Sequence, residues 1–398
     1  MEQYSELSKN ITKSLDKETK KKNGIYITPQ SIIQTMFKNI HKYMKNIHTI
    51  LEPSCATCEM IHYVDKNYTD KNIVGIELNT TIFDSIANLE FENQVQLINT
   101  DYLQYENENK YDLIIGNPPY FVMAKNLVKK DYCKYFDGRP NIFMLFIIHS
   151  LGKLNKNGIL CFILPKNFLN CLYYDKLRSH ICQNYTILNI IDNTNDKFLE
   201  TQQDTMIFTI QNKKPTSNKK WIIERQGYTI YNDNLKVIQP FFNNSTSLDA
   251  MGFNVKVGNV VWNQVKDKLT NDESKTLLIY SGNIQDRKLV VKGFHNEEKK
   301  QYIDVDGKLG SVLVVNRGYG NGEYKFNYAI INPGQPYLCE NHIIYIIPKQ
   351  DMTPEALLLQ YEKITNSFEN EKTKEFIKLY FANNGINTTE LQHILPIY

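Results

Sequence analysis

Apolar positions along the first half of the chain follow two alternating patterns. Short continuous runs, typical of strands buried on both faces, are separated by stretches in which apolar residues recur at helical spacing. The expected strands are 48–51, 73–76, 95–98, 113–115, 159–164, 187–191 and 205–211. The expected helices are 31–44, a helix from about 60, 141–154 and 168–181. Strands that alternate with helices predict an α/β fold with a doubly wound, mostly parallel, Rossmann-like sheet.

The second half of the chain has a different pattern. From about residue 255, short apolar strands alternate with turns, and helical stretches follow, notably at 354–368. This pattern predicts a separate C-terminal α+β domain. A polar break at 243–247 marks the expected boundary. The predicted organisation is therefore a polar arm at 1–23, a first domain at 24–245 and a second domain at 246–398.

Acidic residues stand at the carboxyl ends of three successive predicted strands: Glu52, Glu77 and Asp101. A loop of small residues and a helix follow Glu52, which is the arrangement of the nucleotide-binding unit of a doubly wound sheet. Loop amides and a helix N-terminus can receive a carboxylate there. An acidic residue about twenty positions beyond such a loop, as Glu77 is, typically holds ribose hydroxyls. Each acid alone is weak evidence, and the three form a specific constellation together with the Asn-Pro-Pro-Tyr sequence that follows them.

The sequence Asn117-Pro-Pro-Tyr120 directly follows the apolar run at 113–115. Two prolines forbid both helix continuation and ladder pairing, so the strand must end in a stiff loop at the ligand-binding edge of the sheet. The Asn117 amide and the Pro118 carbonyl can accept both hydrogens of an exocyclic amino group, and Tyr120 can stack on the ring that bears it. The alternative is an ordinary Pro-Pro turn with a core tyrosine.

Asn-Pro-Pro-Tyr is the signature of amino methyltransferases that use S-adenosylmethionine. With the acidic strand ends, the chain resembles the gamma-class, TaqI-like DNA adenine-N6 methyltransferases. The resemblance covers residues 24 to about 211 well and the C-terminal domain in outline. It implies that 24–245 is the S-adenosylmethionine-dependent catalytic domain and that 246–398 is a DNA target-recognition domain.

The resemblance assigns roles residue by residue. Glu52 would face the cofactor's ammonium and Asp101 its adenine amino group. Family members have the pattern acidic-Pro-Ala-x-Gly-x-Gly at this loop, whereas here Ser54 and Cys58 stand where small residues or glycine are usual. Either the loop tolerates a small thiol or cofactor binding is weakened. The expected cofactor-binding residues are Tyr26, Thr28, Glu52, Ser54, Glu77, Asp101, Tyr102 and Asn117.

The remaining expected roles concern the substrate. Asn117, Pro118 and Tyr120 are the expected catalytic residues, and a flipped base would lie between Tyr120 and Phe198. Several of these positions have simpler alternatives: a helix cap for Tyr26 and Thr28, and core packing for Tyr102 and Phe198. In the C-terminal domain a glycine-rich loop follows Arg317, and it is either a DNA contact or a plain hairpin. The expected DNA-binding residues are Asn283, Arg287 and Arg317.

Composition limits the class of protein and the cellular compartment. A hydrophobic content of 42% and a charged content of 22% are those of a soluble globular protein, and a net charge of +3 permits nucleic-acid binding without demanding it. The seven cysteines are odd in number and irregularly spaced, which indicates reduced thiols in an intracellular protein. Cys55-x-x-Cys58 has no second ligand pair at zinc-finger spacing, so no metal is expected. Neither a signal region nor a membrane span is apparent.

We therefore predict transfer of a methyl group from S-adenosylmethionine to N6 of a flipped adenine in double-stranded DNA. The expected protein is a monomer, either an orphan or the modification enzyme of a restriction-modification type system with a separate cognate endonuclease. RNA adenine and a protein glutamine amide remain alternative substrates, and cytosine N4 is chemically possible. A DNA-binding module that has lost its cofactor is a further alternative.

Overall fold

The computed structural model describes residues 4–193, 198, 203–291, 293–317, 326–381 and 386–398. By its internal contacts the chain divides into two compact units. The first comprises Met1–Glu224 and Tyr228–Asp233, and the second comprises Arg225–Gly227 and Asn234–Tyr398. The division falls near 233 rather than at the expected 245. The segment between these points belongs to the second unit because Phe241 and Phe242 pack on Phe376, with ring centroids 5.8 and 5.4 Å apart.

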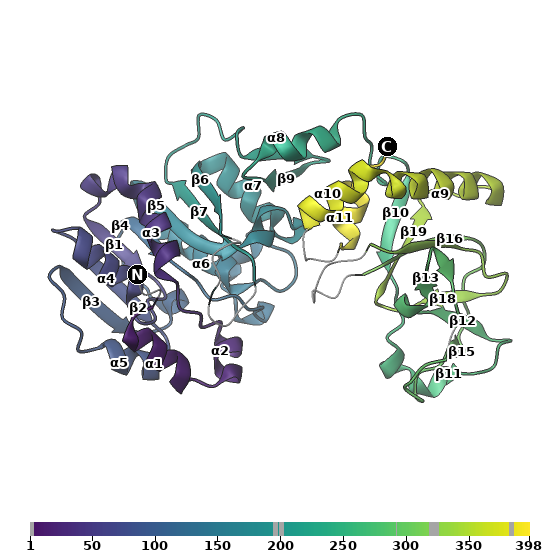
Figure 1. The fold of residues 1–398 in the computed structure, drawn as a ribbon, viewed down its shortest axis with the longest axis horizontal. Coiled ribbons are helices and arrows are strands. Elements are labelled where there is room, and N and C mark those ends of the chain that lie inside the picture. Colours follow the sequence, from purple (N-terminus) through teal and green to yellow (C-terminus); the bar gives the residue numbers. More distant parts are fainter. Residues whose placement is uncertain (1–3, 194–197, 199–202, 292, 318–325, 382–385) are drawn as a thin grey trace. The chain divides into compact units, whose positions relative to one another are not determined.

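A seven-stranded sheet forms the centre of the first unit, in the order β3-β2-β1-β4-β5-β7-β6 (Figure 1). All neighbours from β3 to β5 are parallel, and β7 runs antiparallel to both β5 and β6. This confirms the predicted doubly wound, mostly parallel sheet. The strands are β1 (Thr49–Glu52), β2 (Asn72–Glu77), β3 (Gln94–Asn99), β4 (Tyr111–Gly116), β5 (Leu154–Pro165), β6 (Thr186–Asp192) and β7 (Thr205–Gln211).

Helices bury both faces of this sheet. Alternate strand residues point to opposite faces, so Leu113 and Ile115 belong to one core cluster and Ile114 to the other. The first cluster includes α3 (Gln30–Ile40), α4 (Glu59–Asn67) and α5 (Thr80–Ile86). The second includes α6 (Ile142–Lys153) and α7 (Asp175–Asn184). The predicted N-terminal arm contains two short helices, α1 (Glu6–Ser14) and α2 (Lys17–Asn23).

The helix predicted at 168–181 begins later than expected, at Asp175. Two short 3-10 turns, Lys166–Leu169 and Leu172–Tyr174, precede it. The cause is the buried Arg178, whose guanidinium donates to the carbonyl oxygens of Phe168 and Cys171 at 2.8 and 2.7 Å. Those carbonyls are thereby satisfied without continuing a regular helix.

The second unit has two four-stranded sheets, ordered β10-β19-β16-β17 and β11-β15-β12-β18. Together with helices α9 to α11, they confirm the predicted α+β architecture. The strands are β10 (Phe253–Val257), β11 (Leu269–Thr270), β12 (Thr276–Ile279), β15 (Tyr302–Ile303), β16 (Val312–Asn316), β17 (Tyr328–Ile331), β18 (Tyr337–Cys339) and β19 (Ile343–Pro348). The second unit also contains the short hairpin of β13 (Ile284–Gln285) with β14 (Lys288–Leu289). The other short hairpin, β8 (Ile222–Arg225) with β9 (Tyr228–Tyr231), belongs mostly to the first unit. The helices are α8 (Leu235–Ile238), α9 (Pro354–Glu369), α10 (Glu371–Phe381) and α11 (Thr388–His393).

Two features of the fold bear on the position of a site. Strands β1 and β4 are neighbours from which the chain winds in opposite directions, and the crevice at such a switch point is where doubly wound sheets bind ligands. Among the residues that the structure describes, no helix has the length and apolarity to cross a membrane.

Candidate cofactor and methyl-transfer site

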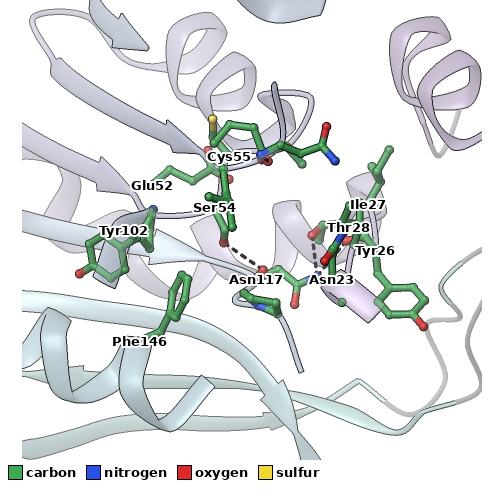
Figure 2. A pocket seen from close by; sticks show the side chains of 18 of the residues that line it. Asn23, Tyr26, Ile27, Thr28, Glu52, Ser54, Cys55, Tyr102, Asn117 and Phe146 are labelled. Atoms are coloured by element: carbon green, nitrogen blue, oxygen red, sulfur yellow. Dashed lines mark hydrogen bonds between the residues drawn. The ribbon is translucent and has the colours of Figure 1, made fainter. Parts of the chain in front are cut away.

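A cavity of about 340 Å³ opens at the carboxyl ends of β1 to β4 (Figure 2). Its volume lies in the range of small-molecule sites, roughly 300–1,000 Å³. The lining comes from the segment before α3, from the loops after each of these four strands, and from α6. The lining residues include Gly24, Tyr26, Thr28, Glu52, Ser54, Ala56, Thr57, Glu59, Glu77, Leu78, Asp101, Tyr102, Asn117, Pro119 and Phe146.

Residues 53–58, between β1 and α4, form a loop that we call the cofactor loop. Ala56 and Cys58 have φ values of +43° and +63°, although neither is glycine. These are the two glycine positions of the family pattern, and an L-residue in the left-handed region costs roughly 1–2 kcal/mol. Neighbouring groups hold this shape: the Ala56 amide donates to Glu77 Oε2 at 2.9 Å and the Cys58 amide to the Cys55 carbonyl at 2.7 Å.

The three acidic strand ends meet at this cavity. Glu52 is buried, and its Oε2 has no hydrogen-bond partner among the described residues. Burial, together with the nearby thiol of Cys58 and carboxylates of Glu59 and Glu77, raises the pKa of Glu52 well above its ordinary value. Burial also raises the pKa of Glu77, although amide donors of the surrounding loops oppose the shift. Asp101 Oδ1 accepts from the Leu103 amide at 2.9 Å.

Asn117 is held from several directions. Its Nδ2 donates to the Tyr26 carbonyl at 3.2 Å and to Thr28 Oγ1 at 3.3 Å, and its backbone carbonyl accepts from Ser54 Oγ at 3.2 Å (Figure 2). Because both donations use the amide nitrogen, the amide oxygen faces away from Thr28. There Oδ1 accepts from the Tyr120 hydroxyl at 2.8 Å. The arrangement fixes which end of the Asn117 amide is the acceptor.

The two predicted base-stacking residues pack against different core clusters of the first unit. Tyr120 packs against the cluster of α6, with its ring edge-on to Phe143 at 6.0 Å, and its hydroxyl also lies 2.9 Å from the Ile163 carbonyl. Phe198 is 7% exposed and belongs to the cluster on the other face of the sheet. Phe198 also lines a small cavity with Tyr26. Tyr102 lines the cavity as a core residue, with its hydroxyl 2.8 Å from Ser150 Oγ.

Three further residues shape the cavity and were missed from the sequence. Leu78 follows Glu77 and is 66% exposed, and Phe146 reaches the cavity from α6 (Figure 2). An apolar side chain directly after an acidic strand end was the available signal for Leu78. Gly24 ends α2 with φ +64°, and a Cβ there would lie 2.8 Å from the Tyr120 nitrogen. The segment before α3 therefore packs directly on the Asn-Pro-Pro-Tyr loop.

The predicted DNA-binding residues of the second unit have different surroundings. Asn283 is 2% exposed. Its Oδ1 accepts from the Tyr280 amide and its Nδ2 donates to the Val290 carbonyl, so it is a structural residue rather than a surface contact. Arg287 is largely exposed but pairs with Glu369 at 2.6 Å. Arg317 is exposed at the end of β16. The glycine-rich segment 318–322 lies outside the described residues.

The chain is similar to known DNA methyltransferases. Residues 33–199 match the Eco57I restriction-modification methylase family. The type II methyltransferase M.CvrRI and the modification methylase CviBIII, from Paramecium bursaria Chlorella viruses XZ-6E and NC1A, are each 25% identical over the whole of this chain and of their own length. The type II methyltransferase M.AccI of Acinetobacter calcoaceticus is 31% identical over 46% of this chain and 36% of its own.

These matches support a DNA methyltransferase of the restriction-modification type that uses S-adenosylmethionine. Among solved structures, the type IIG restriction endonuclease BpuSI aligns with 93% of the methyltransferase and 59% of its own chain, at 11% identity and a TM-score of 0.41. The fold assignment of the methyltransferase rests on its own strand order.

The cavity fits the cofactor of the methyltransferase. The Oε2 of Glu52 is a buried acceptor with no partner among the described residues, and the ammonium of S-adenosylmethionine can satisfy it. Glu77 at the end of β2 and Asp101, two residues after β3, also line the cavity and would be the acceptors for ribose hydroxyls and an adenine amino group. Leu78 and Phe146 supply apolar surface for a planar ring. Charged, polar and apolar parts of the cofactor thus have matching groups in one cavity.

Proposed function

We propose that the methyltransferase transfers the methyl group of S-adenosylmethionine to N6 of adenine at a specific site in double-stranded DNA. The observation that carries this proposal is the oriented amide of Asn117, which stands at the edge of the cofactor cavity within an Asn-Pro-Pro-Tyr loop. An amide oxygen so placed can accept from an amino nitrogen beside the methyl donor.

The chemistry needs acceptors rather than a base or a nucleophile. The lone pair of the adenine amino group is delocalised into the ring, so that nitrogen is a poor nucleophile. Hydrogen bonds from its two hydrogens to Asn117 Oδ1 and the Pro118 carbonyl favour a more tetrahedral nitrogen. Its lone pair would take the methyl group as the bond of that group to sulfur breaks, and the methylated nitrogen would then lose one proton to solvent. Thr28 and Tyr26 fix the amide before the substrate arrives. Such preorganised dipoles and positioning carry most of the barrier reduction in this mechanism.

S-adenosylmethionine supplies an activated methyl group, and the chain's own residues bring the acceptor nitrogen to it. N6 of adenine is unreachable within a stacked duplex, so the base must be flipped out of the helix. We propose that Tyr120 stacks on the flipped base and gives up its hydrogen bond to Asn117 Oδ1 when the amino group takes that acceptor. Stacking by Phe198 requires that it leave its present packing.

The second unit is proposed to recognise the DNA. In this proposal Arg317 contacts a base or a phosphate, because it is an exposed arginine at a strand end. Arg287 is proposed as a backbone contact that would exchange its pairing with Glu369 for a phosphate. The enzyme is proposed to act as a monomer, with any cognate endonuclease on a separate chain.

The test is transfer of labelled methyl groups to unmethylated duplex DNA, followed by digestion to nucleosides and mass analysis. The expected product is N6-methyladenine, confined to one sequence. N4-methylcytosine as the product would overturn the choice of base. Label in RNA or in a glutamine-containing peptide, with none in DNA, would overturn the substrate. The Asn117→Ala variant, prepared in parallel, controls for a contaminating activity.

A further inference from the structure

The N-terminal helix α1 makes a buried polar contact with the residues around the cofactor loop. The Glu59 carboxylate, in the first turn of α4, accepts on Oε1 from the Ser5 amide at 3.3 Å, from Ser5 Oγ at 2.5 Å and from Ser8 Oγ. Its Oε2 accepts from Gln30 Nε2 at 2.6 Å. Ser8 is fully buried and Glu59 is 6% exposed. Four donors from α1, its N-cap and α3 therefore converge on one buried carboxylate.

The same helix also reaches the cofactor loop itself. Ser8 Oγ lies 2.6 Å from Thr57 Oγ1, and both side chains are buried. Because Ser8 donates its hydroxyl proton to Glu59, Thr57 is the donor in this second bond. Thr57 stands between Ala56 and Cys58, the two residues with left-handed φ. Helix α1 is thus bonded to the part of the loop whose backbone is strained.

A strained backbone persists only where the surrounding structure determines it. Glycines would make the required shape intrinsically accessible, but this loop has none. Contacts from outside the loop take that part instead. Glu77 holds the Ala56 amide from within the sheet, and Ser8 of α1 bonds Thr57. Glu59, which follows the loop directly, is itself held by α1. Thr57 and Glu59 both line the cofactor cavity.

We propose that α1 is part of the cofactor site. Ser5 and Ser8 are positioning residues that hold Glu59 and Thr57, and through them they keep the cofactor loop in the shape that binds S-adenosylmethionine. Without these hydroxyls the Glu59 carboxylate would remain buried with too few donors, which is costly. It would turn towards water and free the loop to relax. The inference rests on S-adenosylmethionine as cofactor and is independent of which base is methylated.

A purely structural role for α1 predicts something different. If the helix only covered the core beneath it, loss of the Ser8 hydroxyl would lower the melting temperature and leave the cofactor affinity of the folded protein unchanged. The two roles are therefore separated by cofactor affinity, measured apart from turnover.

The experiment is calorimetric titration of the full chain with S-adenosylhomocysteine. Ser8→Ala is expected to weaken affinity by about tenfold, as loss of a hydrogen bond to a charged group implies. The KM for S-adenosylmethionine should rise similarly, with kcat at saturating cofactor within about twofold. Ser14→Ala is the matched control, because that serine lies on the same helix but donates to the Ile11 carbonyl. Ser5→Ala should also weaken binding, and Ser5→Thr, which keeps the hydroxyl, should restore it.

A measurement on the unaltered protein guards against variants that do not fold. Because binding couplings are reciprocal, S-adenosylhomocysteine must stabilise α1 if α1 stabilises the cofactor loop. Amide hydrogen exchange over residues 6–14 should therefore slow when the ligand is bound. Unchanged exchange, or equal affinity in the wild type, Ser8→Ala and Ser5→Ala proteins, would overturn the inference. Failure of the wild type to bind S-adenosylhomocysteine would instead overturn the assignment of the cofactor.

Discussion

The loop after β1 and the loop after β4 leave neighbouring strands and line the same cavity, but they are made rigid in different ways. The Asn-Pro-Pro-Tyr loop owes its stiffness to its own covalent structure, because two consecutive prolines fix φ and remove two donors. The cofactor loop has one proline at its start and then two residues, Ala56 and Cys58, in a conformation that they do not favour. Groups outside that loop hold it in place: Glu77 accepts from the Ala56 amide, and Ser8 of helix α1 bonds Thr57.

The two loops therefore position their active-site residues in two different ways. A loop that is stiff by composition can present one side chain, Asn117, with little help beyond the bonds that set its amide. A loop that is held from outside depends on residues far away in the sequence, here Glu77 and helix α1. Changes in the first loop should therefore affect the chemical step, and changes around the second should affect cofactor binding and stability.

The largest expected effect comes from a change in the Asn-Pro-Pro-Tyr loop. Asn117→Ala removes the amide oxygen that accepts from the substrate amino group, and kcat should fall by about 10²–10³-fold, as for the loss of one preorganised group. Affinity for S-adenosylhomocysteine should change little, because the prolines still fix the backbone. Single-turnover methyl transfer and calorimetry measure the two quantities. If cofactor affinity fell as far as kcat, the two loops would not be functionally separable.

Variants of Tyr120 test the same loop through the substrate base. Tyr120→Ala should weaken binding of a flipped base by about 1–3 kcal/mol, the usual value of stacking on an aromatic side chain. Tyr120→Phe keeps the ring and removes only the hydroxyl that lies between Asn117 Oδ1 and the Ile163 carbonyl. It should retain most of the binding. Fluorescence of 2-aminopurine at the target position reports the flipped state, and equal losses in both variants would argue against stacking.

The ionisation of Glu52 should make both protein stability and cofactor affinity depend on pH. Its raised pKa in the folded protein means that, between the unfolded and folded pKa values, the folded state binds more protons, so the stability of the cofactor-free protein falls as pH rises. Ammonium binding favours the ionised form. Cofactor affinity should therefore weaken as pH falls through the raised pKa, by up to about tenfold per pH unit, with proton release on binding.

Calorimetry with S-adenosylhomocysteine in buffers of different ionisation enthalpy measures that proton release. Glu52→Gln should bind more weakly and show a flatter pH dependence, with what remains attributable to Glu77, whose pKa is also raised. A pH dependence that is unchanged in this variant would show that another group titrates.

The smallest expected effect tests the strain in the cofactor loop. Ala56→Gly should relieve roughly 1–2 kcal/mol of left-handed strain and lose about 0.5–1 kcal/mol through the more flexible unfolded chain. A small net stabilisation and a slightly higher melting temperature are expected. Ala87→Gly is the control. Ala87 has φ −56° at the end of α5, so glycine relieves no strain there and the variant protein should be less stable. A lower melting temperature in both variants would contradict the strain argument.

The features that were predicted correctly from the sequence depend on local chemistry. Continuous apolar runs mark strands buried on both faces, and the predicted strands of the first domain are present. Strand β5 begins earlier than expected, at Leu154. The end of β4 was predictable because proline cannot continue a ladder. The late start of α7 was not, because the carbonyl partners of Arg178 depend on its burial.

The site residues, too, could be predicted only where local sequence determines their position. The acidic strand ends could be located from their place after apolar runs. The sequence could not show that Glu59 receives donors from residues more than fifty positions earlier, since nothing local to either segment encodes that contact. Asn283 is predicted from the sequence as a DNA contact, and only the tertiary structure shows that its amide is used inside the second unit. The stacking role of Phe198 stays a prediction.

The hydrogen bond between the Tyr120 hydroxyl and Asn117 Oδ1 has a consequence for selectivity. In the proposed reaction the incoming amino group displaces an existing donor, so the acceptor is never empty and the number of hydrogen bonds at Asn117 does not rise. Little enthalpy can then come from that contact alone, and any ring with an amino group could make the same exchange. Preference for one base must arise from the shape of the pocket around the ring and from the cost of extruding that base from the duplex.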